Sequence, residues 1–512
     1  MSSSATRPSS PPPPPSSPPD PNHGVRPEYP RDETIIDQLF RHVAASPASP
    51  ALVVPEGDGD EPGRIELSYA ALWSAIDQAA DVLTAGRPTG STQWVIMVLP
   101  QGLQQVVGVW GILRAGLGYV PIDAATAAPR LQMLFEECSP CVAIGEHGPT
   151  PVANVANACG VALGTFPSGA RFGLTLGTAS DGGNEAAAPR LPTPETHALL
   201  LFSSGSTGTP KGIVYDHRWL MGGSYFVGRD LELTSSSRCL LRCSYVWSVS
   251  LYDLFPVNMF GGTLVVPPRG GDMNVQYIGE TISREGIHAV VIQPTLLNLL
   301  LDEHNASASF PLRSLRHVVT SGEKLFTSTA EAFVRSAGLE ASLWNMYGAT
   351  EAGCTYFVVS GTSDADELRA YPEGVPAGVP QAYVDAFVML ATGDDDGDDP
   401  LQPLPSGEIG EICFGDGGAG FMAVGYWRNA ALTAKQFVLT KSFGRLYRTG
   451  DAGKFEGGQL HVSGRLDRQV KVCSSPRSPL FRIHKLKLRS PLLPLIHRCE
   501  ACASSRRRSR RD

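Results

Sequence analysis

LFSSGSTGTPKGIVYDH, residues 201–217, carries the strongest structural signal in the chain. The apolar run at 199–202 predicts a buried strand, which leads into serine, threonine and glycine residues and ends in Pro-Lys-Gly at 210–212. Such small residues let backbone N–H groups surround an anion, and Lys211 adds a full positive charge. A Walker A loop is excluded because proline precedes the lysine and glycine follows it. The segment therefore predicts a phosphate-binding loop. A flexible linker, the alternative, is disfavoured by the preceding strand and by His217 six residues after the lysine.

The composition indicates a soluble globular protein with a large core. The chain has 512 residues, of which 42% are apolar and 18% charged, enough for more than one domain. Its formal charge of −8 disfavours binding to nucleic acid or to a membrane surface. No apolar run reaches the roughly 18 residues of a membrane-spanning helix. The N-terminus also lacks the charged and apolar regions of a secretory signal.

The ten cysteines are scattered over the chain, which indicates reduced thiols in a cytoplasmic protein. Two Cys-x-x-Cys pairs, Cys138/Cys141 and Cys499/Cys502, are far apart and lack zinc-ribbon spacing. Metal binding by cysteine is therefore disfavoured, and we expect a cytoplasmic protein with no nucleic-acid or membrane partner.

Helical and strand patterns alternate along most of the chain. After a Ser- and Pro-rich tail at 1–30, apolar residues at helical spacing predict a helix from Ile35 to Val43, capped by Asp32 or Thr34. Residues 149–194 predict only one or two weak strands and a loop. Further strands are predicted at 51–54, 94–99, 264–266, 289–292 and 315–319, and further helices at 67–85, 104–115, 218–227 and from 281 onward. This alternation indicates an α/β fold.

NMYGATE, residues 345–351, lies about 140 residues after the lysine loop and offers two groups suited to a nucleotide. Tyr347 presents an aromatic face on which an adenine ring can stack. Glu351 presents a carboxylate for a magnesium ion that bridges phosphate oxygens. Either residue alone would say little about function. Their position after the predicted phosphate loop supports a nucleotide site.

Four segments together resemble the adenylate-forming (AMP-binding) superfamily. They are the loop at 203–211, NMYGATE at 345–351, YRTGD at 447–451 and GRLDRQVKV at 464–472. That superfamily includes nonribosomal peptide synthetase adenylation domains, acyl- and aryl-CoA synthetases and luciferases. RAGLGYVPID at 114–123 and QVK within the last segment are most similar to the peptide-synthetase branch.

The resemblance covers about residues 33–472 and implies the domain organisation. We expect an α/β large domain at 31–466, with two β-sheet subdomains, flanking helices and a distorted β-barrel. A hinge is expected at 467–472. The family continues with a small C-terminal domain, whereas residues 473–512 here form a basic Pro-, Ser- and Arg-rich tail, so we expect that domain to be truncated. A targeting or RNA-binding tail is the alternative reading of its arginines.

The resemblance also implies the site. Lys211, Thr207, Glu351 and Arg465 are the expected catalytic residues, and Glu351 is the expected ligand of Mg²⁺. In the family the residue matching Asp451 binds both ribose hydroxyl groups, which suits a carboxylate as a double acceptor. The expected ATP-binding residues are Ser203, Ser204, Gly205, Ser206, Thr207, Gly208, Thr209, Lys211, Tyr347, Gly348, Thr350, Asp451 and Arg465. The expected substrate-binding residues are Trp247, Ser248, Val249, Tyr252, Val291, Val319, Ser321, Met346, Cys354 and Thr355.

Ser248 departs from the family's pattern. Amino-acid-activating members hold the substrate's ammonium group with an aspartate at the matching position, and a neutral hydroxyl cannot offset the cost of desolvating that charge. An α-keto, α-hydroxy, aryl or aliphatic acid therefore fits better than a standard amino acid. Asp253, five residues further on, stands where the family often has glutamate.

Three functional hypotheses follow. The first is an adenylation domain that converts a small carboxylic acid and MgATP into an acyl-adenylate and pyrophosphate, with a carrier protein in trans as a candidate partner. The second is an acyl- or aryl-CoA ligase, favoured by Ser248. The third is a nucleotide-binding remnant without activity. The first, an AMP-forming ligase of secondary metabolism, is the main prediction.

Overall fold

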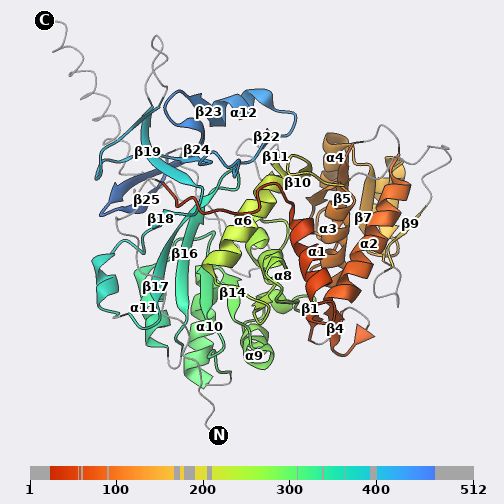
Figure 1. Cartoon of the computed structure of the whole chain (residues 1–512), viewed down its shortest axis with the longest axis horizontal. Helices are drawn as coiled ribbons and strands as arrows, with labels where there is room; N and C mark the ends of the chain where they lie inside the picture. The colour runs from red at the N-terminus through yellow and green to blue at the C-terminus, as the bar shows by residue number, and fades with distance from the viewer. Residues whose placement is uncertain are drawn as a thin grey trace, which may run out of the picture.

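The computed structural model describes residues 23–55, 57–58, 61–88, 92–166, 173–177, 191–203, 210–307, 310–336, 339–363, 365–391 and 401–466. Three large β-sheets, with helices on and between them, make up this part of the chain (Figure 1). Most of the predicted phosphate loop (204–209), the predicted hinge and the basic tail lie outside the described residues.

The eight-stranded sheet holds the strand that leads into the phosphate loop. Alternate side chains of β5 belong to different cores: Val95 and Met97 pack toward α2 and α3, and Ile96 packs with α4 and α5. The strand order is β22 (Gly425–Tyr426), β11 (Lys211–Asp216), β10 (His197–Ser203), β6 (Gly118–Pro121), β5 (Trp94–Val98), β7 (Val142–Gly145), β8 (Ala162–Thr165) and β9 (Thr175–Leu176). The helices are α1 (Ile35–Ala45), α2 (Tyr69–Gly86), α3 (Leu103–Arg114), α4 (Ala128–Cys138) and α5 (Pro151–Ala158).

The nine-stranded sheet carries the predicted substrate pocket on one face. Its order is β18 (Val379–Pro380), β17 (Cys354–Ser360), β16 (Ser342–Gly348), β15 (His317–Thr320), β14 (Ala289–Ile292), β12 (Arg238–Leu240), β13 (Thr263–Val265), β1 (Pro50–Val54) and β4 (Ile65–Ser68). The helices α9 (Val275–Glu285), α10 (Pro294–Ser307) and α11 (Thr327–Arg335) lie on the outer face. The helices α6 (His217–Asp230), α7 (Leu251–Leu254) and α8 (Pro256–Met259) lie on the inner face, and α6 runs through the middle of the molecule (Figure 1).

The third sheet is antiparallel throughout and corresponds to the predicted distorted barrel. It contains β20 (Leu401–Pro403), β19 (Asp385–Ala391), β21 (Gly410–Gly415), β24 (Gly444–Glu456) and β23 (Phe437–Thr440), with β25 (Gln459–Arg465) paired to β24. The helix α12 (Ala430–Gln436) precedes β23, and a short hairpin of β2 (Gly57–Asp58) and β3 (Glu61–Pro62) stands apart. The predicted α/β class, with two sheet subdomains and a third β unit, is confirmed.

Two local predictions were wrong. The helix expected to begin at Thr281 is α9, which begins at Val275 behind an Asn274 cap and ends at Gly286, a glycine in the left-handed region. The stretch expected to hold only strands and loop contains α5, which Thr150 caps by accepting a hydrogen bond from the Ala153 N–H. The sequence held a signal for each helix start: an Asn274 cap for α9, and a Thr150 cap followed by Pro151 for α5.

Residues 23–30, which the sequence placed in the tail, pack against the protein. The backbone of Gly24 donates to Val384 O at 2.8 Å, and the side chains of His23 and Arg26 both contact the Asp385 carboxylate. Tyr29 joins an aromatic cluster with Phe226 of α6 and Phe421. The packed part of the chain therefore includes residues that precede residue 31.

We predict that replacing two neighbouring glycines of α6 by alanine changes the stability of the fold in different ways. A Cβ at Gly222 would lie 1.8 Å from the Phe421 ring, so Gly222→Ala should destabilise the fold by about 1–3 kcal/mol through overpacking. A Cβ at Gly223 meets nothing closer than 3.5 Å, so Gly223→Ala should be neutral or stabilise by up to about 1 kcal/mol through helix propensity. Urea unfolding measures both, and equal effects would contradict this packing.

Candidate functional site

The predicted phosphate loop begins and ends on two paired strands. Ser203, the last residue of β10, pairs with Lys211, the first residue of β11, and both side chains are partly buried. The backbone N–H of Trp427 donates to Gly212 O at 2.7 Å, so the β22 segment fixes the far side of β11. The loop ends are thus held at one edge of the eight-stranded sheet. Its predicted ligands at 204–209 lie outside the described residues.

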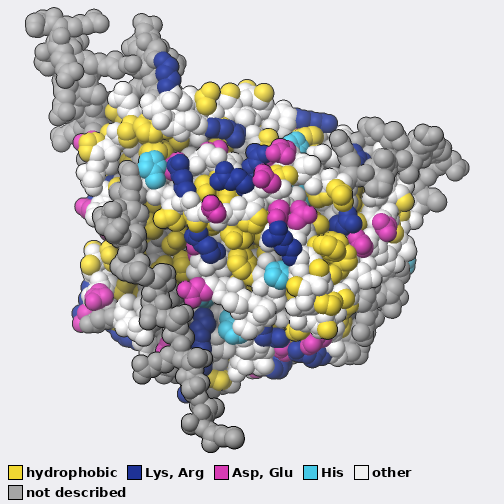
Figure 2. All heavy atoms as spheres, viewed as in Figure 1, with side chains coloured by type: hydrophobic (Ala, Val, Ile, Leu, Met, Phe, Trp, Pro, Cys, Tyr) yellow, Lys and Arg dark blue, Asp and Glu magenta, His cyan; other side chains and the backbone are white. Residues whose placement is uncertain are grey.

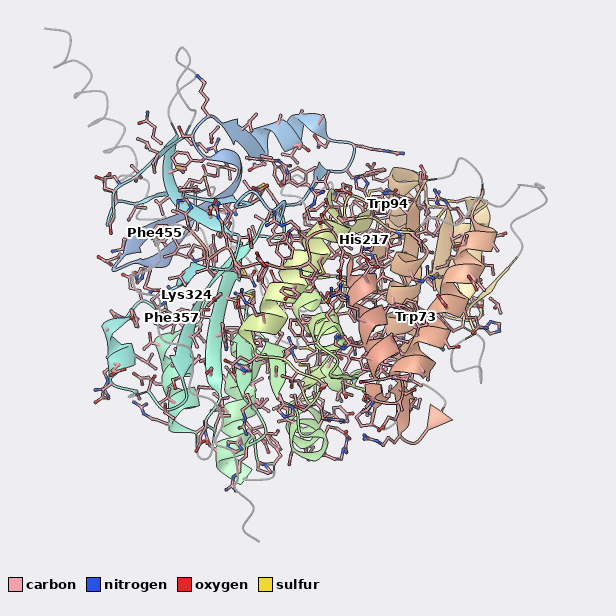
Figure 3. All side chains as sticks on the ribbon, viewed as in Figure 1. Trp73, Trp94, His217, Lys324, Phe357 and Phe455 are labelled. Carbon is pink, nitrogen blue, oxygen red and sulfur yellow. The ribbon has the colours of Figure 1, made fainter. Side chains whose placement is uncertain are left out.

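His217, which the sequence grouped with the loop, is a core residue. Its side chain is fully buried at the first position of α6 (Figure 3), and neither ring nitrogen has a hydrogen-bond partner among the described residues. Burial lowers the pKa of His217 to about 4, against a smaller opposing effect of Asp37 on α1. The imidazole is therefore neutral at physiological pH and packs between α6 and α1.

Three strands bring Tyr347, Asp451 and Arg465 together. The Tyr347 hydroxyl on β16 donates to Asp451 Oδ2 at 2.7 Å, and Arg465 Nη1 donates to Asp451 Oδ1 at 3.2 Å. Asp451 on β24 and Arg465 on β25 are also direct cross-strand partners. Burial and the neighbouring carboxylate raise the pKa of Tyr347 well above its usual value, so the phenol keeps its proton as a donor. Three residues that the sequence predicts for ATP binding therefore form one hydrogen-bonded unit.

The Arg465 guanidinium is fixed by a second bond. Its Nη1 also donates to the backbone carbonyl of Thr449 at 2.8 Å, and the Thr449 hydroxyl donates to Ile412 O at 2.7 Å. Asp451 N in turn donates to the Thr449 hydroxyl at 3.0 Å. Thr449 thus holds both charged residues, a role that the sequence did not predict.

Glu351 lies in the turn after β16, beside two tyrosines. The Tyr426 hydroxyl donates to Glu351 Oε1 at 2.7 Å, and Tyr447 interacts with the same carboxylate. Burial, and then the Glu351 charge, raise the pKa of both phenols, which keeps them as donors. The backbone carbonyl of Thr350 accepts from the Tyr215 hydroxyl, which fixes the turn.

This arrangement fits a magnesium ion that arrives with a nucleotide. Among the described residues no group of three or more His, Cys, Asp or Glu side chains could hold a metal by itself. Mg²⁺ in nucleotide sites usually takes one or two carboxylates and fills its other positions with phosphate oxygens and water. Glu351, with one oxygen bonded to Tyr426, can supply such a carboxylate.

The predicted substrate-binding residues lie on the inner face of the nine-stranded sheet and on η1 (Ser248–Ser250) and α7. Val291 and Val319 are cross-strand neighbours, and Cys354 pairs with Gly348. The Tyr252 hydroxyl interacts with the Cys354 thiol. Met346 and Thr355 are buried, Val249 and Ser321 are partly buried, and Trp247 stands apart because its side chain is 49% exposed.

Ser248 is turned toward the nucleotide side of the site. Its hydroxyl lies 3.3 Å from the Thr350 hydroxyl, one residue before Glu351. The structure therefore links the predicted substrate residues to the predicted nucleotide residues through one pair of hydroxyl groups.

Several residues of the site were not predicted as functional: Tyr215, Tyr426, Tyr447 and Thr449. Tyr447 lies inside the YRTGD motif at 447–451, whereas Tyr426 lies outside the motifs noted above, and nothing in the sequence indicated that either contacts Glu351. Tyr426 and Glu351 are separated by 75 residues and meet because β22 returns to the edge of the eight-stranded sheet.

The visible surface carries mixed charge. Lys, Arg, Asp and Glu side chains are interspersed across the face in Figure 2 without a broad field of one sign. Within the described ranges, no helix is both long and apolar enough to cross a membrane.

Comparison with known proteins gives consistent matches. Residues 39–427 match the AMP-binding enzyme family. The chain is 30% identical over 457 residues to a mycosubtilin synthase polypeptide of Bacillus subtilis, covering 87% of this chain and 16% of the relative. It is 28% identical to tyrocidine synthase 3 of Brevibacillus parabrevis, and the match covers 87% of this chain and 6% of that relative. The chain thus spans less than a fifth of the length of either relative.

Solved structures agree with this fold. The nonribosomal peptide synthetase FmoA3, bound to α-methyl-L-serine-AMP, is 25% identical with a TM-score of 0.68, covering 88% of this chain and 46% of that one. CmiS6 is 22% identical with a TM-score of 0.69, covering 86% of this chain and 100% of that one. The second likeness concerns the fold alone.

We predict that His217 makes the fold less stable in acid. The unfolded histidine has a pKa near 6.5, whereas the folded one has about 4, so between these values the unfolded state binds a proton that the folded state does not. Stability is therefore lost as pH falls through this window, by about 2 kcal/mol between pH 7.5 and pH 5. His217→Leu should lose that much less than the wild type over the same range. Urea unfolding at both pH values measures the difference, and parallel losses would contradict the buried neutral histidine.

Proposed function

The chain belongs to the AMP-binding enzyme family, and from that premise we propose that it joins a carboxylic acid to AMP, releasing pyrophosphate. Membership confirms the resemblance to peptide-synthetase adenylation domains and the class of AMP-forming ligases. The specific acid, the release of pyrophosphate and the acceptor are the proposal.

The Tyr347–Asp451–Arg465 unit is the observation that carries the proposal. It joins a tyrosine and a guanidinium to one carboxylate by direct hydrogen bonds, and the three residues come from strands of two sheets. These are the groups that adenine, ribose and phosphate need. Each Asp451 oxygen accepts one protein donor, which leaves lone pairs for the two ribose hydroxyl groups.

The chemistry requires positioning and charge neutralisation. An oxygen of the substrate carboxylate attacks the α-phosphorus, a C(O)–O–P bond forms, and the bond to the β-phosphate breaks with pyrophosphate as leaving group. Lys211 and the loop that begins at Ser203 would neutralise the β- and γ-phosphates, and Arg465 would face the phosphate side. Mg²⁺, held by Glu351 and phosphate oxygens, would neutralise further charge when bound.

The substrate proposed is an acid without an α-ammonium group. Ser248 replaces the expected carboxylate, and its hydroxyl lies beside Thr350, another neutral group. A keto, hydroxy, aryl or aliphatic acid would need no buried counter-ion there. The likeness to peptide synthetases favours a carrier protein in trans as acceptor, within secondary metabolism. A cytoplasmic setting remains part of the proposal, and the seven cysteines in the described ranges are free thiols.

A CoA ligase is the second candidate, because Ser248 also suits that branch of the superfamily. The two candidates share adenylation and differ in the second half-reaction. Acid-dependent release of AMP that requires CoA would identify the ligase, whereas pyrophosphate exchange without turnover on CoA would favour a carrier-protein thiol.

The proposed function is tested by ATP–pyrophosphate exchange on the 512-residue chain, with panels of keto, hydroxy, aryl, aliphatic and amino acids. We expect Mg²⁺-dependent exchange with an acid that lacks the α-amino group. ATP binding without exchange for any acid would instead indicate a nucleotide-binding remnant.

Within this assay, we predict that Lys211→Ala lowers exchange at least about 100-fold, as loss of one transition-state charge ligand typically does. Lys435→Ala, on the exposed surface of α12, is the matched loss of a lysine and should leave the rate unchanged. Equal rates for the two variants would remove Lys211 from the proposed phosphate site.

A further inference from the structure

A small cavity lies beneath the predicted substrate pocket. It has a volume of about 10 Å³, room for about one water molecule, and lies between β14, β15 and α7. Tyr252, Val291 and Val319, three of the predicted substrate-binding residues, line it together with Asp253. The remaining lining is largely aliphatic, so Asp253 contributes the one carboxyl group among the described residues that border it.

The Asp253 carboxyl group uses only one of its oxygens. Oδ2 accepts hydrogen bonds from the backbone N–H groups of Cys243 at 2.8 Å and Arg242 at 3.0 Å. Oδ1 is buried and has no hydrogen-bond partner among the described residues. The side chain is 3% exposed, so bulk water does not satisfy this oxygen.

The neighbouring charged group does not supply the missing bond. The Arg242 guanidinium is also buried, and it donates to the Val291 carbonyl at 2.7 Å and to the Gln293 side chain. The Cys243 thiol interacts with the Asp253 carboxyl group but leaves Oδ1 unbonded. An unmet carboxyl oxygen in an apolar surrounding costs free energy of the order of 1–3 kcal/mol.

Backbone capping alone does not account for this arrangement. Holding the N–H groups of Cys243 and Arg242 takes one acceptor oxygen, Oδ2, and does not involve the other oxygen. Oδ1 is left over, and it can bond to a group that enters the cavity.

The size and chemistry of the cavity select the kind of group. A hydroxyl oxygen is about as large as a water molecule and fits the volume. An ammonium group has three donors and a full charge, and the cavity offers a single free acceptor. A hydroxyl can donate or accept, so it suits the carboxyl group in both protonation states. Both states occur near neutrality, because burial raises the pKa of Asp253 to about 7.

We propose that Asp253 forms the floor of the substrate pocket and selects a carboxylic acid whose far end carries a hydroxyl group hydrogen-bonded to Oδ1. This specificity rests on the proposed adenylation. It adds to that reaction a substrate class, an acid with one polar group at each end and an apolar middle along Val291, Val319 and Tyr252.

The test compares acids that differ by one terminal hydroxyl group in ATP–pyrophosphate exchange. The pairs are benzoate and 4-hydroxybenzoate, phenylpyruvate and 4-hydroxyphenylpyruvate, phenylalanine and tyrosine, and valerate and 5-hydroxyvalerate. We expect at least about a 100-fold preference in kcat/KM for the hydroxylated member of the accepted pair, because a site built to bind a hydroxyl rejects the analogue that lacks it.

Asp253→Leu should bring this ratio close to one, while Asp253→Asn should retain part of it because the amide can still bond to a hydroxyl. Asp216→Leu is the matched control. Asp216 is another buried carboxyl that accepts a backbone N–H, from Trp219 at 2.9 Å, and it does not line the cavity. It should lower stability and leave the ratio unchanged.

The outcomes separate the two proposals. Exchange by the wild type without a hydroxyl preference, or an unchanged ratio in Asp253→Leu, overturns the role of Asp253 and leaves adenylation standing. No exchange with any acid overturns the proposed function, and the specificity with it. If Asp253→Leu does not fold, the wild-type preference for the hydroxylated acid, together with the ratio in Asp253→Asn, tests the role of Asp253.

Discussion

The buried carboxylate of Asp451 is the interaction on which the rest of the site depends. It accepts one hydrogen bond from the nine-stranded sheet, through Tyr347, and one from its own sheet, through Arg465. A charge removed from water is stable only where such donors are fixed, and here Thr449 fixes them. The position of β16 against β24 is therefore coupled to the geometry of the predicted nucleotide site. A shift of either sheet would break a charge-assisted bond, so this carboxylate and the hydrophobic core that the two sheets share hold their ligands in one arrangement.

The helix α6 is the second element that positions the site. It follows directly after β10 and β11, the strands on either side of the predicted phosphate loop, and it packs between the sheets. Close approach requires glycine at two of its positions: Gly222 faces Phe421, and Gly228 faces Phe260. At its start, His217 turns into the core toward α1 and remains neutral. The histidine that closes the motif in sequence is thus a neutral core residue, and Lys211 remains the motif's candidate for a positive charge at the predicted phosphate site.

The sequence analysis identified residues that carry chemistry and missed those that hold them. Tyr347, Asp451 and Arg465 were predicted from motifs as ATP-binding residues, and the structure brings their side chains together through Asp451, while their role in ATP binding stays a prediction. Tyr426 and Thr449 were not, because their roles arise from contacts between segments far apart in the chain, and periodicity reports only local structure. The helix α5 was not predicted for another reason. A short helix rich in alanine and asparagine has a narrow apolar face, so its Thr150 cap and Pro151 were the main sequence signals of a helix. Helix positions were thus less predictable than motif positions.

The predicted substrate-binding region holds polar groups in two places, Ser248 beside Thr350 and Asp253 beside a small cavity. At the nucleotide end, Ser248 and Thr350 present a pair of neutral hydroxyl groups where amino-acid-activating relatives hold a charge. At the other end, Asp253 lines a small cavity, and its Oδ1 has no hydrogen-bond partner among the described residues. Ser248 begins η1 and Asp253 lies five residues further on in α7, which follows η1 directly, so one short helical stretch carries both groups. Without a substrate ammonium group to neutralise it, a carboxylate at position 248 would leave a second negative charge near Glu351, which follows Thr350. The recognition proposed for Asp253 would instead act within a cavity lined largely by aliphatic side chains, none of which is a predicted nucleotide-binding residue.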